Sequence, residues 1–363
     1  MNDPRALVYH RFRLFSFFSG LLFQLAALLV LTFSRFSQIL FEAAGNNESV
    51  YFCLVFGFLT LVSFPLDYAS GHVLEKKFSL SKQSFGAWLF DFFKKTFLSL
   101  LLFLVTSAGF FAAVRLWPHA WWFVLALAWF FLSAVLATLF PVFILPLFYP
   151  SRPLADAAAK ERLLAWCRKL GYPAMDIHEI GFSKKTVKAN AALTGFGRTR
   201  RVLLGDTLLS GFTPDEIQMV LSHEIGHHIR HHLLKGLLID LLTALAAFYA
   251  LYAASAPVAR WAGVDSLADT RALPALSLLA FAANILWMPF RNTLSRRHER
   301  EADRYAWEVF PSEKTFISVM TKLAEKNLSH RSPARWEEAL LADHPSIDRR
   351  IVAARMFFSR RSC

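Results

Sequence analysis

Six long apolar stretches alternate with polar segments, and this alternation is the strongest pattern in the chain. The apolar stretches cover residues 14–34, 51–66, 95–115, 120–149, 233–258 and 272–290. Most of them reach the roughly 20 residues that an α-helix needs to cross a hydrocarbon core about 30 Å thick. A spanning helix also satisfies its own backbone hydrogen bonds without water. The pattern therefore predicts a polytopic α-helical membrane protein with about six spans, possibly seven.

Three of these stretches differ from an ordinary span in length or position. The stretch 51–66 is short, whereas 120–149 is long enough to tilt, or to break at Pro141 and Pro146. The stretch nearest the N-terminus could be mistaken for a signal peptide. Its apolar core is long and no convincing small-residue cleavage site follows it, so we expect a retained anchor.

The two long polar segments predict folded structure outside the spans. Segment 150–232 opens with a polar helix around Lys160–Lys169. Two strand-like runs follow, at about Ile177–Phe182 and Arg201–Leu204. Segment 291–363 is polar and mostly helical in pattern. Mixed helices and strands of this kind predict a mainly helical α+β unit.

Composition agrees with the membrane interpretation. Hydrophobic residues make up 55% of the 363 and charged residues 18%, against about 25% charged in soluble domains. The net charge is +13, a value that often indicates nucleic acid as a partner. No basic–aromatic module occurs outside the spans, so we predict no nucleic-acid binding. Basic loops held against anionic lipid headgroups explain the charge.

The basic residues also predict orientation. With six spans, 35 of the 40 Lys and Arg residues fall on one side, in segments 1–13, 67–95, 150–232 and 291–363. The positive-inside rule then places both termini and both long polar segments in the cytosol, at a bacterial inner membrane or a eukaryotic endomembrane. Because they share one compartment, the two segments can form one split domain. A seventh span would separate them.

The sharpest local motif is H-E-x-x-H, from His223 to His227, on a helix with a capping box before it. Side chains four residues apart project from one helix face, so His223 and His227 can share a zinc ion. Glu224 points to the neighbouring edge of that face, where it can take a proton from water instead of binding the metal. The nearby histidines are assigned no chemistry in this prediction: His228, His231 and His232.

A catalytic zinc site needs a third protein ligand, with the fourth position open to water. The polar run that follows the last apolar stretch offers His298, Glu299 and Glu301. Helical periodicity alone does not choose between Glu299 and Glu301. Asp303 lies one turn after Glu299, so it could orient a ligating histidine through its carboxylate.

These residues resemble a known family. H-E-x-x-H, followed after two spans by S-R-x-x-E-x-x-A-D, is similar to the pattern of the integral-membrane zinc metallopeptidases. That group includes the type 1 CAAX prenyl proteases and the bacterial heat-shock membrane peptidases. Three further stretches resemble the E-E-K-H-G-F-N-x-Q-T, N-A-Y-x-x-G-F and H-P-P-x-x-x-R motifs of the prenyl protease branch: Glu75–Ser84, Asn190–Gly197 and His344–Ile351. The departures of this chain from these motifs include Ser79, Ala192 and Ser346.

The resemblance implies a role for several residues. Glu299 would be the third zinc ligand and Glu224 the general base. His344 and Arg350 would contact the substrate or the developing oxyanion. The resemblance also implies an edge strand that pairs with an extended substrate, and a water-filled chamber enclosed by the spans. The edge strand would contain Asn190 and Ala191.

The predicted domain organisation follows from the motifs and the spans together. A split zincin-like catalytic domain is expected on the cytosolic side, in two parts. The predicted boundaries are a four-span membrane domain at 1–150, the first catalytic part at 151–232, two further spans at 233–291 and the second catalytic part at 292–363.

The predicted function is that of a zinc-dependent membrane endopeptidase with one Zn²⁺ per chain. It would cleave a peptide bond near the C-terminus of prenylated, CAAX-type proteins or of other membrane-associated proteins. A prenyl group adds membrane affinity of about 0.8 kcal/mol per buried methylene. One alternative is a general quality-control protease of the membrane without prenyl specificity. Another is a metal-binding transporter or scaffold, but such a site needs no base such as Glu224 beside a ligand.

Overall fold

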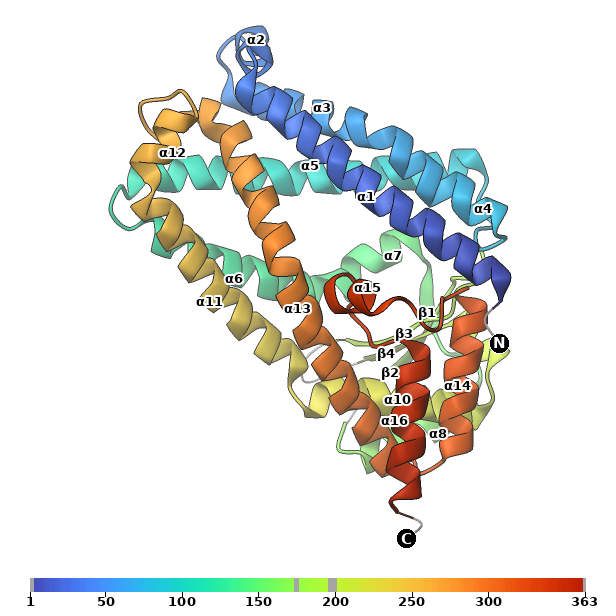
Figure 1. The fold of residues 1–363 in the computed structure, drawn as a ribbon. Coiled ribbons are helices and arrows are strands. Elements are labelled where there is room, and N and C mark those ends of the chain that lie inside the picture. The colour runs from blue at the N-terminus through green and yellow to red at the C-terminus, as the bar shows by residue number, and fades with distance from the viewer. Residues whose placement is uncertain (1–2, 173–175, 195–200, 362–363) are drawn as a thin grey trace.

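The computed structural model describes residues 3–172, 176–194 and 201–361. Part of the predicted Asn190–Gly197 motif, namely Gly195, Phe196 and Gly197, therefore lies outside the described residues. In the described chain, six helices are long and apolar enough to cross a membrane, as the sequence predicted. Figure 1 shows these helices splayed above a compact unit that contains the sheet, and both chain ends lie beside that unit.

Four of the six spans precede the sheet. They are formed by α1 (Pro4–Phe33), α3 (Glu48–Tyr68), α5 (Phe85–Leu116) and α6 (Trp121–Leu139), with the short α2 (Phe36–Ala43) between the first two. α3 continues through a π-helical turn, η1 (Ala69–Leu74), into α4 (Glu75–Lys77), so the stretch predicted to be short belongs to a 30-residue helical segment. α6 likewise passes through η2 (Phe140–Ile144) into α7 (Leu145–Phe148), at the two prolines where a break was predicted.

The last two spans are joined by short segments. α11 (His232–Ala253) leads through α12 (Ser255–Trp261) and a 3₁₀ turn, η4 (Thr270–Ala272), into α13 (Leu273–Val309). α13 has no break at residue 291, where the sequence predicted the boundary between a span and the second catalytic part. The apolar pattern ends there because the helix leaves the apolar layer, not because the helix ends. One continuous helix therefore connects the membrane part to the polar part.

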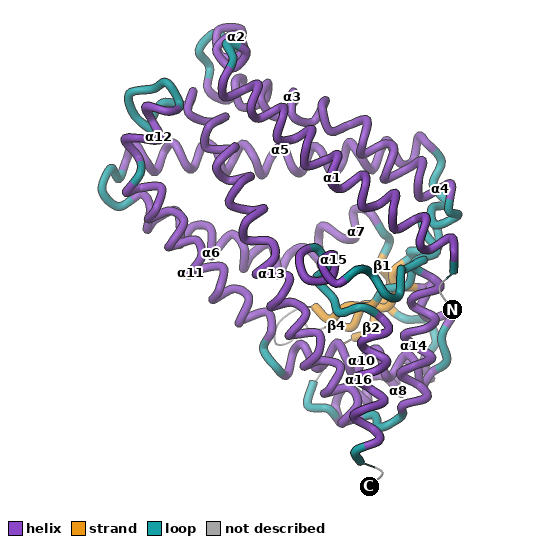
Figure 2. The backbone as a smooth tube through the Cα atoms, viewed as in Figure 1, coloured by secondary structure: helices purple, strands orange, loops and turns teal. Residues whose placement is uncertain are grey.

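A four-stranded sheet lies in the polar part (Figure 2). Its strands are β1 (Ser151–Pro153), β2 (Asp176–Ile180), β3 (Ala191–Thr194) and β4 (Arg201–Gly205), in the order β1-β2-β4-β3. β2 and β4 are parallel and the other two pairings are antiparallel. β2 and β4 match the predicted runs, while periodicity did not predict the short β1 and β3. β3 is an edge strand of the described sheet.

Helices from both halves of the chain complete this unit, three of them in contact with the sheet and three packed on other helices. They are α8 (Ala157–Lys169), α9 (Asp206–Gly211), α10 (Pro214–Ile229), α14 (Glu313–Lys326), α15 (Arg335–Leu340) and α16 (Ile347–Ser359). One hydrophobic core joins Leu204 and Leu221 from the first half to Ala306, Phe316 and Ile351 from the second. The two polar segments therefore fold as one unit. This requires that both lie on the same side of the membrane.

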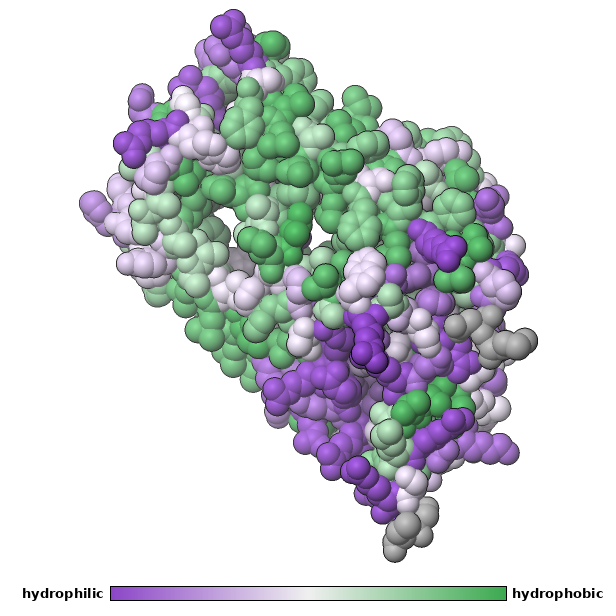
Figure 3. Space-filling model, viewed as in Figure 1, coloured by the Kyte–Doolittle hydropathy of each residue, from purple (hydrophilic) through white to green (hydrophobic). Residues whose placement is uncertain are grey.

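The surface has two chemically distinct parts. Figure 3 shows a hydrophobic upper part formed by the span helices, with open gaps between them, and a hydrophilic lower part. Large apolar side chains of the spans are strongly exposed, including Phe15, Leu61, Phe97, Phe131 and Leu242. Exposed apolar surface of this extent is stable in contact with lipid tails and costly in water.

Candidate active site

The H-E-x-x-H motif lies on α10, and its capping box is confirmed. The Thr213 hydroxyl accepts a hydrogen bond from the Glu216 N–H at 3.3 Å, and the Glu216 carboxylate accepts one from the Thr213 N–H at 2.7 Å. Burial raises the pKa of Glu216, but hydrogen bonds from Lys322 and Ser318 outweigh burial and hold it below its usual range. An ionised Glu216 therefore fastens the start of α10 to α14.

α10 and α13 cross closely at a pair of small residues. A β-carbon added to Gly226 would lie 3.1 Å from the Cα of Ala302 and 3.2 Å from its carbonyl oxygen. The missing side chain lets the two backbones approach each other. This approach brings His223 and His227 on α10 within reach of Glu299 on α13.

We expect Gly226→Ala to push α10 and α13 apart, because backbone atoms of Ala302 cannot rotate out of the way. Overpacking of this kind costs about 1–3 kcal/mol, and the separation of the helices should also weaken zinc binding. Thermal unfolding and zinc titration of the purified protein in detergent measure both effects. Gly236→Ala is the matched control, since open space surrounds Gly236 on α11. Wild-type stability and zinc affinity in Gly226→Ala would show that the close crossing is unimportant.

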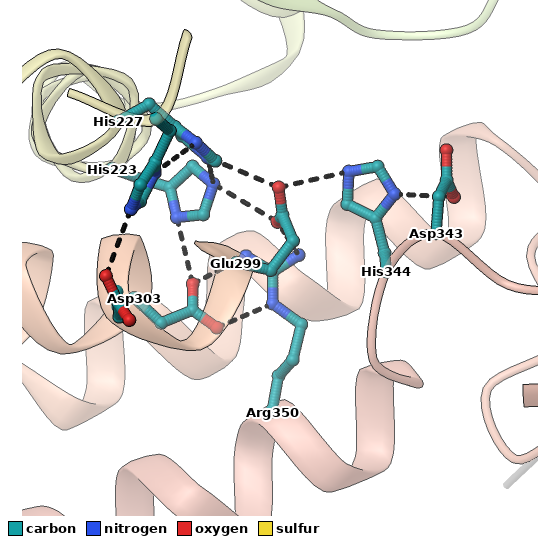
Figure 4. A network of polar contacts seen from close by, with 9 residues as sticks. His223, His227, Glu299, Asp303, Asp343, His344 and Arg350 are labelled. Carbon is teal, nitrogen blue, oxygen red and sulfur yellow. Dashed lines mark hydrogen bonds and ion pairs between the residues drawn. The ribbon is translucent and has the colours of Figure 1, made fainter. Parts of the chain in front are cut away.

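Three potential metal ligands converge between the two helices (Figure 4). The Nε2 atoms of His223 and His227 are 3.2 Å apart. The Glu299 carboxylate is 3.2 Å from His227 Nε2 and 3.4 Å from His223 Nε2. Tetrahedral zinc with bonds of about 2.0–2.1 Å separates its ligand atoms by about 3.3 Å. All three distances are close to this value, with the two histidines facing different oxygens of the Glu299 carboxylate.

The surroundings of Glu299 also fit a cation. Its side chain is buried, with 5% of the residue exposed, and its Oε2 has no hydrogen-bond partner. A buried carboxylate oxygen without a partner is costly. Each Nε2 carries either a proton or a lone pair. The two neutral imidazoles therefore cannot both donate to Glu299 and also accept a hydrogen bond from each other. A metal ion in their midst satisfies all three groups, so the donor set fits zinc.

Asp303 and Arg350 lie directly behind His223. Asp303 Oδ1 is 3.0 Å from His223 Nδ1. Arg350 on α16 holds the same carboxylate from the other side, at 2.8 Å through Nε and 2.6 Å through Nη2. A carboxylate at Nδ1 keeps the proton on that nitrogen and leaves Nε2 free to bind a metal. The structure thus brings Arg350 to Asp303, and its Nη1 lies 3.9 Å from Glu299.

Glu224 and His344 lie at the same centre. Glu224 is half-buried on α10 next to His223, and burial raises its pKa. His344 Nε2 is 3.4 Å from Glu299 Oε1, and Asp343 accepts a hydrogen bond from His344 Nδ1 at 2.8 Å. The hydrogen bond to Asp343 raises the pKa of His344. His344 is therefore biased toward the form in which both ring nitrogens donate.

The loop that presents His344 is held by α13, which sequence reasoning did not predict. The Arg296 guanidinium is buried and donates to the carbonyls of Ala339 and Ala342 at 3.0 and 2.5 Å. Asn292 donates to the Leu340 carbonyl at 2.8 Å. These carbonyls end α15 and its following turn, so α13 caps that helix. Only the position of Arg296 in the S-R-x-x-E motif hinted at this role.

Asn190 and Ala191 lie at the start of the edge strand β3. Ala191 pairs with Leu204 of β4, and the Asn190 carbonyl accepts a hydrogen bond from the Gly205 N–H at 3.0 Å. α10 packs against β3. The strand therefore runs beside the helix that carries His223 and His227, and its outer edge has no partner strand among the described residues.

Two histidines and a glutamate on crossing helices, with an edge strand beside them and six apolar spans attached, define a membrane metallopeptidase. The model of peptidase family M48 matches residues 153–357, which is more than half of the chain, so the chain belongs to this family. A second model, described as the CAAX prenyl protease N-terminal region with five membrane helices, matches residues 6–150. The described chain has four helices of span length in that region.

Individual relatives agree with the family assignment. The chain is 30% identical over 312 residues to an uncharacterized metalloprotease, YhfN, of Bacillus subtilis, covering 85% of this chain and 73% of that protein. It is 27% identical to CAAX prenyl protease 1 of Saccharomyces cerevisiae, covering 81% and 69%. The crystal structure of S. mikatae Ste24p superposes with a TM-score of 0.78 and 25% identity, covering 84% of this chain and 75% of that one. These likenesses confirm the prediction of a polytopic helical membrane protein with a catalytic domain, and the metalloprotease activity.

Proposed function

We propose that this protein is a zinc-dependent endopeptidase that cleaves CAAX-type C-termini at the cytosolic face of a membrane. The observation that carries the proposal is the convergence of His223, His227 and Glu299. Glu224, next to His223 on α10, is half-buried. A transport or scaffold site would need the three ligands but has no use for a half-buried base next to one of them.

His223, His227 and Glu299 would hold one Zn²⁺. When bound, zinc supplies a Lewis acid that polarises a carbonyl and makes water more acidic. Glu224 accepts the proton of the attacking water and returns it to the leaving amine. Burial of Glu224 supports this role, since a raised pKa makes its carboxylate a stronger base. Asp303 and Arg350 keep His223 in the orientation that binds metal.

The substrate would bind as an added strand. The free edge of β3, at Asn190 and Ala191, offers main-chain donors and acceptors to an extended peptide. Such pairing gives affinity with little demand on side-chain sequence. His344 then places an N–H donor near the oxygen that becomes negatively charged, where one donor is worth about 10²–10³ in rate.

The CAAX-type substrate rests on the relatives and on the chemistry of lipidation. Several curated relatives carry the name CAAX prenyl protease 1, among them those of yeast and of Arabidopsis thaliana. A farnesyl group would concentrate its peptide at the bilayer surface, next to the polar part of the enzyme. The basic polar segments favour a cytosolic location for this part and for both termini.

The proposal is tested with one CAAX peptide, prepared with and without its farnesyl group, and the purified protein in detergent. We expect zinc-dependent cleavage of the farnesylated peptide at a rate at least tenfold above that of the free peptide. Cleavage of both peptides at the same rate would instead identify a general membrane-surface peptidase. If neither peptide is cleaved by zinc-loaded protein, CAAX processing is excluded.

A further inference from the structure

A buried histidine lies behind the second zinc-binding histidine. The helix α10 ends at Ile229, and His231 adopts a left-handed conformation, with φ of 54°. This turn redirects the chain into the membrane helix α11 and places His232 at its first position. His232 is only 6% exposed. The run of neighbouring histidines in the sequence predicted no chemistry for this residue.

His232 contacts side chains from two other helices. Its Nδ1 is 3.0 Å from Nδ1 of His227 on α10, and its Nε2 is 3.2 Å from Oε2 of Glu301 on α13. The His298 ring stacks on it with centroids 4.1 Å apart and planes 9° from parallel. Both ring nitrogens are thus engaged, so His232 has no nitrogen left for a metal.

The protons along this chain of contacts can be assigned from the zinc site. If His227 binds zinc through Nε2, its proton is on Nδ1 and must be donated. His232 Nδ1 is the acceptor, so the His232 proton is on Nε2, where Glu301 accepts it. Each hydrogen bond then has one donor and one acceptor, and every group keeps its ordinary protonation state.

Glu301 is itself held in place. Arg297 lies 3.3 Å from its Oε1, and Lys235 lies 3.7 Å from its Oε2. This arrangement parallels the other ligand, where Asp303 contacts His223 directly and Arg350 holds Asp303. Each zinc-binding histidine is therefore supported by a carboxylate that a basic side chain holds. For His223 the carboxylate makes the contact directly, and for His227 it acts through the imidazole of His232.

We infer that His232 is a positioning residue which, together with Glu301, orients His227 for zinc. The inference rests on the proposed zinc site and deepens it. It adds a link from the membrane to the metal, because His232 is the first residue of the span helix α11. Partners of this kind typically change metal affinity by about 10–100-fold.

The test compares the purified full-length variants in detergent by two measurements other than activity. Zinc affinity is measured by competition with a chromophoric chelator, and the visible absorption spectrum of the Co²⁺-loaded protein reports ligand geometry. We expect His232→Phe, which keeps a stackable ring but no acceptor, to weaken zinc about 10–100-fold and to alter the cobalt spectrum. His232→Asn keeps an acceptor near the Nδ1 position and should recover most of the affinity. His231→Asn is the matched control, since asparagine tolerates the left-handed conformation, and should be unchanged.

The outcomes separate this inference from the proposed function. If the wild-type protein does not bind one zinc, the proposed function fails. If wild type binds zinc but His232→Phe binds it equally tightly with an identical cobalt spectrum, the inference is wrong and the zinc site stands. Should His232→Phe fail to fold, Glu301→Gln replaces it, because this change weakens the acceptor without touching His232. Unchanged zinc affinity in Glu301→Gln would then overturn the inference.

Discussion

Replacing Glu224 by glutamine is expected to lower kcat for peptide cleavage by about 10²–10⁴-fold, the usual contribution of a general acid–base group. The amide cannot accept the proton of the attacking water at neutral pH. Because Glu224 is not among the three metal-ligand candidates, zinc should remain bound at one per chain. Turnover of a farnesylated CAAX peptide and elemental analysis for zinc measure the two properties on the same preparation.

Glu161→Gln provides the matched control for that experiment. Glu161 lies on α8, where its side chain is 70% exposed and pairs with Arg168. The same chemical change there should leave kcat within twofold of wild type, because exposed ion pairs contribute about 0–1 kcal/mol to stability and none to the site. Glu224→Gln protein that keeps wild-type turnover would exclude Glu224 as the base.

Replacing Glu299 by glutamine is expected to remove the metal rather than the base. The change takes away the anionic ligand, leaving the two imidazoles to bind zinc alone. Zinc affinity should therefore fall by more than the roughly 10–100-fold that loss of an outer partner costs. Activity should be lost in parallel at limiting zinc and partly return when zinc is added in excess.

Glu308→Gln on the same helix is the control, since Glu308 pairs with the exposed Arg304. Its zinc affinity should match that of wild type. The pair of experiments also distinguishes the two glutamate roles: Glu224→Gln keeps zinc and loses turnover, whereas Glu299→Gln loses both. Tight zinc binding by Glu299→Gln would mean that the third ligand is another residue.

The sequence predicted the parts of the site that depend on local geometry. His223 and His227 share a face on any helix, and the capping box marks where that helix begins. The choice between Glu299 and Glu301 needed the family resemblance, because it depends on how α10 and α13 cross. The structure shows that Gly226 and Ala302 set this crossing. A hydrophobicity pattern does not report this close approach, because it depends on the small size of the two residues.

Other features escaped prediction for similar physical reasons. The continuity of α13 past residue 291 was missed because hydropathy reports contact with lipid, and helical hydrogen bonds continue after the lipid ends. β3 is only four residues long, too short for alternation to be read. No role was predicted for His232 because His227 and Glu301 contact it only once the left-handed turn at His231 has redirected the chain.

The order in which α10 and α13 leave the ribosome has a consequence for the cell that makes this protein. The H-E-x-x-H helix is synthesised first, and two membrane spans must insert before Glu299 appears. Arg350, which holds Asp303, emerges later still, so at about 5–20 residues per second the nascent chain spends several seconds with an incomplete site. The three-ligand centre therefore cannot form until both intervening spans and the start of the second polar segment have been synthesised.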